Sequence, residues 1–302
     1  MYHNSMNIQD NNTKLQELPF YFTNDRSGNK LFGVQYLPKK SKNLFFILLQ
    51  PLGIERNVVD AVQVNIARAL ASKGISVLRF DYFGTGDSEG SFSDITLKTL
   101  ISDVEAAINY LKNKNVNIEL GIFGLRFGAF LASLIAERLS NELKFLILGA
   151  PIVNAEEAFM MELRQSISTQ AVLFKKVVMD RDKIVENIIN NESTVYQNYD
   201  LANINGFPLT RNMLLSVNDV DIIKNEKKYK NSCLIINIDK VKRKNSNVDK
   251  LMKSYSRASC IETCDIIEKT ILWVHGTFLV KNSTKLNNCI IDWIEKEHGK
   301  RY

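Results

Sequence analysis

The chain has 302 residues, of which 45% are hydrophobic and 24% are charged. These proportions are ordinary for a globular protein, and they exclude a low-complexity disordered chain, collagen and a coiled coil. Lysine and arginine number 39 against 33 aspartate and glutamate residues, which gives a net charge of +6 spread along the chain. Because a nucleic-acid-binding protein gathers its basic residues on one face, we expect no nucleic-acid partner.

The amino-terminal residues and the cysteines predict where the protein is found. Residues 1–17 are polar and lack the apolar core of a signal peptide, so we expect a flexible arm there. No apolar run approaches the roughly 18 residues of a membrane span. The four cysteines form no CxxC pair and have no histidine at zinc-finger spacing. We therefore expect a cytoplasmic protein with reduced thiols and with neither a metal nor a cofactor.

The order of the predicted elements indicates an α/β fold. A β-hairpin is followed by alternating strands and helices, which is typical of a mostly parallel central sheet flanked by helices. Residues 151–225 interrupt the alternation with several helical stretches, which we interpret as a helical insertion, or lid, in a single domain over 18–302. The predicted strands are 19–23, 30–37, 44–49, 75–80, 118–123, 145–149, 233–238 and 258–263. The predicted helices are 58–72, 95–112, 129–139, 155–169, 171–179, 182–189, 247–254 and 285–296.

Two glycine-containing segments are the most specific features of the sequence. Residues 79–90 read RFDYFGTGDSEG, and residues 121–129 read GIFGLRFGA. The first follows a later strand instead of opening the first helix of the sheet, and it does not have the Gly-x-Gly-x-x-Gly pattern of a dinucleotide-binding loop, so we interpret it as a structural loop. The second has the spacing of a nucleophile elbow, in which glycines two residues before and after the nucleophile let a helix pack close to a strand. At the central position it has Arg126.

These motifs resemble the α/β-hydrolase superfamily, in the branch of serine aminopeptidase-like hydrolases. They are particularly similar to the exosortase-system-associated hydrolases, which have a Gly-Leu-Arg-x-Gly-Ala elbow. The resemblance is good over about 18–150 and weak beyond. It implies an α/β-hydrolase fold with a central parallel sheet, and an ancestry among ester, thioester or acyl hydrolases. It also implies that Leu52, in a loop 50–57, and Phe127 supply the oxyanion-hole amides.

An arginine at the elbow leaves two interpretations open. A guanidinium stays protonated and cannot attack an acyl carbon, so a serine mechanism is not expected at this position. Arg126 either binds an anionic ligand beside the helix N-terminus, or it pairs with a structural carboxylate. For the second interpretation the candidate partners are Asp81, Asp87 and Glu55.

The rest of a catalytic triad has candidates in the order that the fold requires. Asp239 ends a predicted strand and is the candidate acid, with Asp265, expected after the last strand, as the alternative. His275 precedes the terminal helix and is the candidate base. Ser88 and Cys264 are weaker candidates for a replacement nucleophile, because neither lies in a strained elbow. We expect Ser88 to brace its loop, and Cys264 is a candidate only because we expect it to follow the last strand near the sheet edge.

Two functions are compatible with these residues. One is a degenerate hydrolase that lacks the serine nucleophile and acts as an accessory or tailoring protein of a biosynthetic pathway. The other is an active hydrolase or acyltransferase that uses a non-serine route with His275 as base. In either case the expected partner is a small acyl or anionic ligand, and the oligomeric state cannot be read from the sequence.

Overall fold

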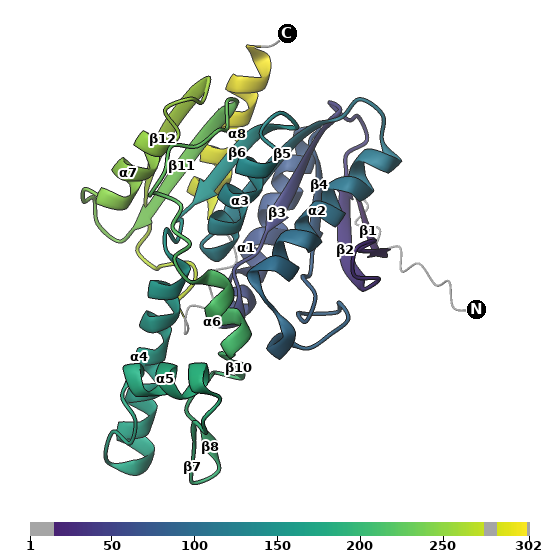
Figure 1. Ribbon diagram of the computed structural model, residues 1–302. Helices are drawn as coiled ribbons and strands as arrows, with labels where there is room; N and C mark the ends of the chain where they lie inside the picture. The colour runs from purple at the N-terminus through teal and green to yellow at the C-terminus, as the bar shows by residue number, and fades with distance from the viewer. Residues whose placement is uncertain (1–14, 275–282, 301–302) are drawn as a thin grey trace.

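The computed structural model describes residues 15–274 and 283–300, which form an eight-stranded sheet covered by helices (Figure 1). The strand order is β1-β2-β4-β3-β5-β6-β11-β12. The strands are β1 (Gln16–Thr23), β2 (Lys30–Leu37), β3 (Leu44–Leu49), β4 (Ser76–Phe80), β5 (Glu119–Leu125), β6 (Leu143–Gly149), β11 (Ser232–Asp239) and β12 (Cys260–Ile267). The pairs β1–β2 and β2–β4 are antiparallel, and the others are parallel. The predicted mostly parallel α/β sheet is therefore confirmed.

The opening hairpin begins earlier than the sequence predicted. Gln16 pairs with Leu37 and Glu17 pairs with Tyr36. Glu17 also accepts a hydrogen bond of 2.6 Å from Nε of Arg68. The last two residues of the arm expected over 1–17 thus belong to the sheet, while residues 1–14 lie outside the described part of the chain.

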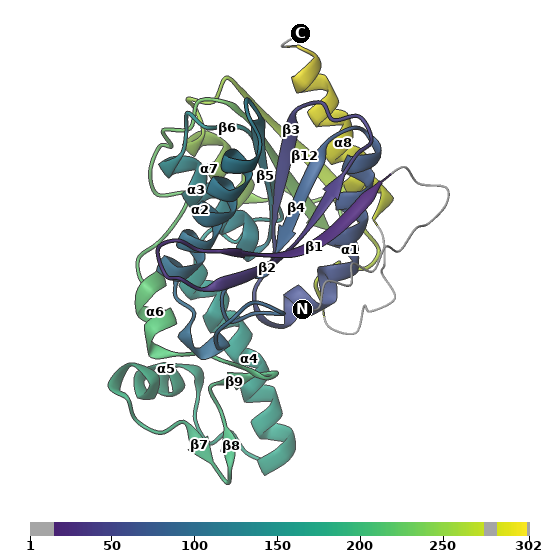
Figure 2. The same cartoon turned by 90° about the vertical axis from the view of Figure 1, so that its right-hand side faces the viewer.

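Helices cover both faces of the sheet (Figure 2). One face packs against α2 (Leu97–Lys114), α3 (Phe127–Arg138) and α7 (Ser246–Ser254), and the other against α1 (Gly53–Ser72) and α8 (Thr284–Gly299). The place of β3 explains its continuously apolar sequence. Phe45 and Ile47 point into the core on the side of α2, α3 and α7, and Phe46 and Leu48 point into the core on the side of α1 and α8. A strand between two helical layers has no face for polar residues.

The segment between β6 and β11 extends from the carboxyl end of the sheet (Figure 1). It contains helices α4 (Ala155–Phe174), α5 (Arg181–Asn190) and α6 (Arg211–Val217). The same segment has two small hairpins, made by strands β7 (Val195–Tyr196), β8 (Tyr199–Asp200), β9 (Asn203–Ile204) and β10 (Phe207–Pro208). A one-turn 3₁₀ helix, η1 (Phe92–Asp94), packs near β10.

Three predicted boundaries are wrong, each for a local reason. The helix expected over 171–179 does not form, because α4 ends at the left-handed Lys175 and Gln170 accepts hydrogen bonds from the amides of Val178 and Met179. Helix α1 begins at Gly53, inside the loop expected over 50–57. Strand β12 continues its register with β11 to Ile267.

Among the described residues, no helix is long and apolar enough to cross a membrane.

Candidate functional site

The turn from β5 to α3, at the carboxyl edge of the sheet, has a strained backbone. Arg126 adopts φ 57° and ψ −117° there, a backbone conformation that residues other than glycine rarely adopt. A Cβ added at Gly124 would lie 2.2 Å from the carbonyl oxygen of Gly128, and one at Gly128 would lie 2.2 Å from the carbonyl oxygen of Leu49. The two glycines therefore allow the close helix–strand approach of a nucleophile elbow.

The side chain of Arg126 is paired with a carboxylate of α1. Its Nη2 lies 3.0 Å from Oε1 of Glu55, and its Nε lies 3.1 Å and 3.3 Å from the two carboxylate oxygens. The guanidinium carbon is 4.7 Å from the ring centroid of Trp273, a cation–π distance. Both charged side chains are largely buried, with 25% and 14% of their surfaces exposed.

Glu55 was one of three carboxylates that the sequence offered as partners, and this pairing is confirmed. Asp81 instead accepts hydrogen bonds from Arg56 and Gln50, and also from the backbone amide of Asp87. These bonds hold the glycine-rich loop against the first residues of α1. The structure thus assigns Asp81 to loop bracing and Glu55 to Arg126.

A second carboxylate, Glu162 of α4, lies at the same place. It accepts no hydrogen bond from the part of the chain that the structure describes. Burial raises the pKa of Glu162 to about 7, and the negative charge of Glu55 adds to this effect while the positive charge of Arg126 opposes it. The site therefore holds two carboxyl groups and one guanidinium, and one carboxyl group is not neutralised by an ion pair.

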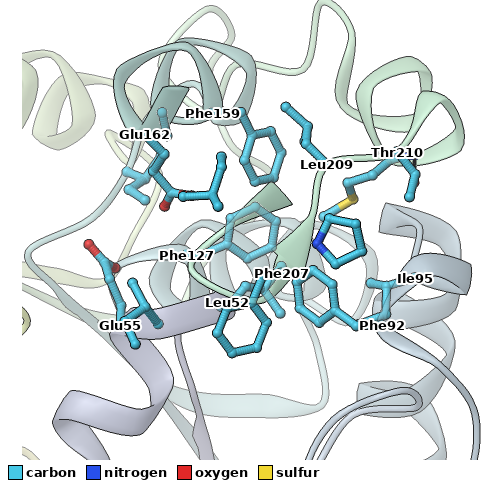
Figure 3. A pocket seen from close by; sticks show the side chains of 17 residues that line it. Leu52, Glu55, Phe92, Ile95, Phe127, Phe159, Glu162, Phe207, Leu209 and Thr210 are labelled. Carbon is cyan, nitrogen blue, oxygen red and sulfur yellow. Dashed lines mark hydrogen bonds between the residues drawn. The ribbon is translucent and has the colours of Figure 1, made fainter. Parts of the chain in front are cut away.

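An apolar pocket opens beside these charges, with a cavity volume of about 40 Å³ (Figure 3). Leu52 and Phe127 line it on the side of the sheet, and Phe159 and Phe207 line it from the segment between β6 and β11. Leu52 is the N-cap of α1, and Phe127 is the first residue of α3. Both residues predicted for an oxyanion hole thus line the pocket, and Phe127 directly follows Arg126 in the chain.

A family model described as serine aminopeptidase, S33, matches residues 61–235, which is more than half of the chain. The chain belongs to this family. The match contains β4, β5 and α3, and so includes both the glycine-rich loop and the strained turn. The resemblance read from the two motifs is confirmed at the level of the serine aminopeptidase family and of the α/β-hydrolase fold.

Solved structures of α/β hydrolases share the fold of this family member at low sequence identity. Est1E from Butyrivibrio proteoclasticus with bound ferulic acid is 19% identical, with a TM-score of 0.58 over 91% of this chain and 99% of that one. The proline iminopeptidase of Mycobacterium smegmatis is 14% identical, with a TM-score of 0.60 over 95% and 100%. The Pyrococcus furiosus esterase Pf2001 is 13% identical, with a TM-score of 0.60 over 94% and 91%.

One curated relative matches a limited region of this serine aminopeptidase family member. The protein RP471 of Rickettsia prowazekii is 30% identical over 99 residues, which is 32% of this chain. The match spans 41% of the relative's own length. This chain is therefore similar to less than half of the relative.

The structure describes the candidate acid of this hydrolase-family chain but not its candidate base. Asp239 ends β11, as predicted, but its carboxylate is hydrogen-bonded to Arg243 and to the amide of Lys240 on its own loop. Partial burial opposes its ionisation, but these hydrogen bonds prevail and hold the pKa of Asp239 below its usual value. His275 lies outside the described residues. Trp273, two residues before it, contacts Arg126.

The weaker nucleophile candidates occupy structural positions. The hydroxyl of Ser88 donates to the carbonyl of Asp81 and accepts from the amide of Phe32, so the expected bracing role is confirmed. Cys264 and Asp265 lie within β12, not after it, because the strand runs to Ile267. Asp265 there accepts a hydrogen bond of 2.9 Å from Asn237.

A metal would find one group of candidate ligands in the described ranges. Atoms of Cys260, Glu262 and Glu297 lie within 4.8 Å of one another. The carboxylate of Glu262 is bonded to Lys296, and that of Glu297 is bonded to Lys300. A cation would have to displace both lysines, so these residues fit an ion-pair network better than a metal site.

Sequence reasoning missed Glu162. It stands in the helical stretch 155–169, where its neighbours give no motif, and only the packing of α4 over the turn brings it to Arg126. A usable signal was present in the pattern: Phe159 and Leu163 are buried at helical spacing, and Glu162 lies three residues after Phe159, on nearly the same face.

Proposed function

We propose that this α/β-hydrolase-fold protein is a degenerate member of its family, without a serine nucleophile, which works as an accessory or tailoring protein of a biosynthetic pathway. The observation that carries the proposal is the pairing of Arg126 with Glu55 in the strained turn. The residue in the place of a nucleophile is a protonated guanidinium, and its charge is engaged by a carboxylate.

The expected consequence for catalysis is large. Removing the nucleophile of a serine triad lowers kcat by about 10⁶-fold. Ser88 does not compensate, because its hydroxyl is already hydrogen-bonded to the backbone of Asp81 and Phe32. On this proposal the protein binds a small acyl or other apolar group in the pocket, and the segment 151–225 covers it as a lid. A cytoplasmic location belongs to the same proposal.

A second candidate function is hydrolysis or acyl transfer by a non-serine route with His275 as base and Asp239 as acid. The contact between Trp273 and Arg126 favours this candidate, because Trp273 lies beside the turn and precedes His275 by two residues in the sequence. In this version the amides of Leu52 and Phe127 stabilise the oxyanion.

A panel of p-nitrophenyl esters and acyl-CoA thioesters separates the two candidates. The degenerate site predicts no turnover above the rate of a heat-denatured sample. Turnover that disappears in His275→Ala but persists in Ser88→Ala would establish the second candidate. Glu156→Gln, a change at an exposed position of α4, serves as a control for the handling of variants.

A further inference from the structure

Two cysteines that are far apart in the sequence meet between the last strand and the last helix. Cys264 belongs to β12 and Cys289 to α8, and both are free and half-buried. Burial raises the pKa of the Cys289 thiol, and its hydrogen bond to Cys264 raises that pKa further. The two thiols are therefore neighbours in the folded chain.

The alternation of β12 directs Cys264 toward the helix. Residues two apart on a strand point to the same face, so Glu262, Cys264 and Ile266 share one face of β12. Glu262 accepts hydrogen bonds of 2.7 Å and 2.9 Å from Nζ of Lys296 in α8. Ile266 is buried in the same core as Leu286 of α8. The face that carries Cys264 is thus the face that packs against α8.

The periodicity of α8 directs Cys289 toward the strand. Cys289 follows Lys285 by four residues and precedes Lys296 by seven, which places the three side chains on one face of the helix. Lys285 donates a hydrogen bond of 2.6 Å to the carbonyl of Ile267 at the end of β12. Lys296 bonds to Glu262 near the start of the same strand. The helix therefore runs antiparallel to β12, with its cysteine between two cross-links that also bracket the cysteine of the strand.

We propose that Cys264 and Cys289 are a reversible disulfide site that joins the edge strand β12 to α8. The site is independent of the function proposed above, because it involves neither a ligand nor turnover. Its oxidant is a low-molecular-weight disulfide such as glutathione disulfide.

The reaction is two successive thiol–disulfide exchanges. Cys264 loses its proton to solvent and attacks one sulfur of glutathione disulfide, which forms a mixed disulfide and releases one glutathione thiolate. Cys289 then loses its proton, attacks the sulfur of Cys264 and releases the second glutathione thiolate. The two thiolates take up the two protons. Two protein thiols are oxidised to one disulfide, and one glutathione disulfide is reduced to two thiols.

The bond closes a loop that reaches the candidate site. Trp273 lies between the two cysteines in the sequence, and its ring contacts Arg126. A disulfide between β12 and α8 fixes both ends of the segment that makes this contact. Because a cross-link also restricts the unfolded chain, the oxidised protein should be the more stable form.

The other two cysteines provide an internal comparison. Cys233 is fully buried in β11, so a dissolved oxidant does not reach its sulfur. Cys260 pairs with Ser232 across the two strands, and its thiol donates a hydrogen bond of 3.4 Å to Glu262. Oxidation should therefore leave Cys233 and Cys260 as thiols.

The experiment equilibrates the full chain with glutathione and glutathione disulfide, quenches it with acid, unfolds it and alkylates the remaining thiols for mass spectrometry. The reduced protein should take up four alkyl groups, one for each cysteine, and the oxidised protein should take up two. Digestion should release the peptides of Cys264 and Cys289 joined by a disulfide. Four alkylated thiols after equilibration, or a disulfide that joins Cys233 to Cys260, would overturn the proposal.

Two variants assign the bond to its residues. Cys289→Ser should leave Cys264 as a mixed disulfide with glutathione and without an internal bond. Cys260→Ser is the matched control, because Cys260 is a half-buried cysteine on the same face of β12, and the bond should form there as in the unchanged protein. An internal disulfide in Cys289→Ser, or its loss in Cys260→Ser, would contradict the assignment.

The same equilibration in urea shows whether the fold brings the two thiols together. Because a disulfide that stabilises the fold is favoured by the fold to the same extent, the folded chain should be half oxidised at a ratio of glutathione disulfide to squared glutathione about 30-fold lower than the unfolded chain. The oxidised protein should also melt about 4 °C higher than the reduced one. Equal ratios in the two states, or an equal or lower melting temperature, would overturn the proposal.

Discussion

The guanidinium of Arg126 lies against the carboxylate of Glu55, with Nη2 3.0 Å from Oε1 and Nε 3.1 Å from the same oxygen. This pair joins the strained turn before α3 to the first turn of α1. The two elements carry Phe127 and Leu52, the residues predicted for the oxyanion hole. The ion pair therefore fixes the spacing of the two helix starts that border the pocket.

The first prediction concerns the energy of this pair. Arg126→Met should lower the free energy of unfolding by about 2–3 kcal/mol and Glu55→Gln by about 1–2 kcal/mol. The arginine change costs more because it leaves Glu55 facing Glu162 without a cation. Urea denaturation of the double variant should show a loss at least 0.5 kcal/mol smaller than the sum of the single losses, roughly the lower limit for coupled residues. Additive losses would mean that the two side chains do not interact.

The second prediction concerns the close contact of β5 with α3. Gly124→Ala should destabilise the protein by about 3 kcal/mol or more, because the new methyl group meets the backbone of Gly128 and Ala129, which cannot move aside. Gly299→Ala is the matched control, since a Cβ there meets nothing within 4 Å. Thermal unfolding of both variants measures the difference. Similar melting temperatures for the two would contradict the packing of this turn.

The third prediction concerns Asp103 of α2, which is almost fully buried and accepts hydrogen bonds from Phe83 and Asn24. Burial raises its pKa to about 6, above the ordinary aspartate value of 3.8, although these hydrogen bonds oppose the change. Because the folded state holds this proton more tightly, the contribution of Asp103 to stability is fully present below about pH 4 and is lost as the pH rises through 6. The loss amounts to about 3 kcal/mol.

A ¹³C NMR titration of the Asp103 carboxyl carbon tests the direction of this change, with a midpoint expected near pH 6. Asp103→Asn should remove the corresponding decrease in the free energy of unfolding between pH 4 and 7. The exposed Asp94 provides a reference carboxyl group in the same spectrum. A midpoint for Asp103 at or below 4 would show that its hydrogen bonds outweigh its burial.

The sequence was sufficient for features in which local pattern and fold agree. The apolar run of β3, with both faces buried, and the glycines around Arg126 each have one physical reason that can be read from neighbouring residues. Features that depend on distant packing could not be predicted. The proximity of Glu162 to Arg126 comes from the placement of α4, and the end of α4 near Lys175 depends on Gln170 bonding to Val178 and Met179.

The candidate site was predictable only in part for the same reason. The position and strain of Arg126 follow from the Gly-x-Arg-x-Gly spacing, and three possible carboxylate partners could be named. Glu55 could not be chosen among them from the sequence, because we predicted a loop where α1 in fact begins, at Gly53. The last strand was expected to end at 263, so Asp265 and Cys264 were assigned to a loop that does not exist there.

The absence of a serine nucleophile is tested most directly by incubating the protein with a fluorophosphonate probe and measuring its intact mass. An active serine hydrolase treated in parallel confirms that the probe is reactive. The account predicts that the mass of this protein stays unchanged, because Arg126 occupies the strained turn and Ser88 is held in its loop. A stoichiometric adduct on any serine, lost when the protein is unfolded before labelling, would contradict it.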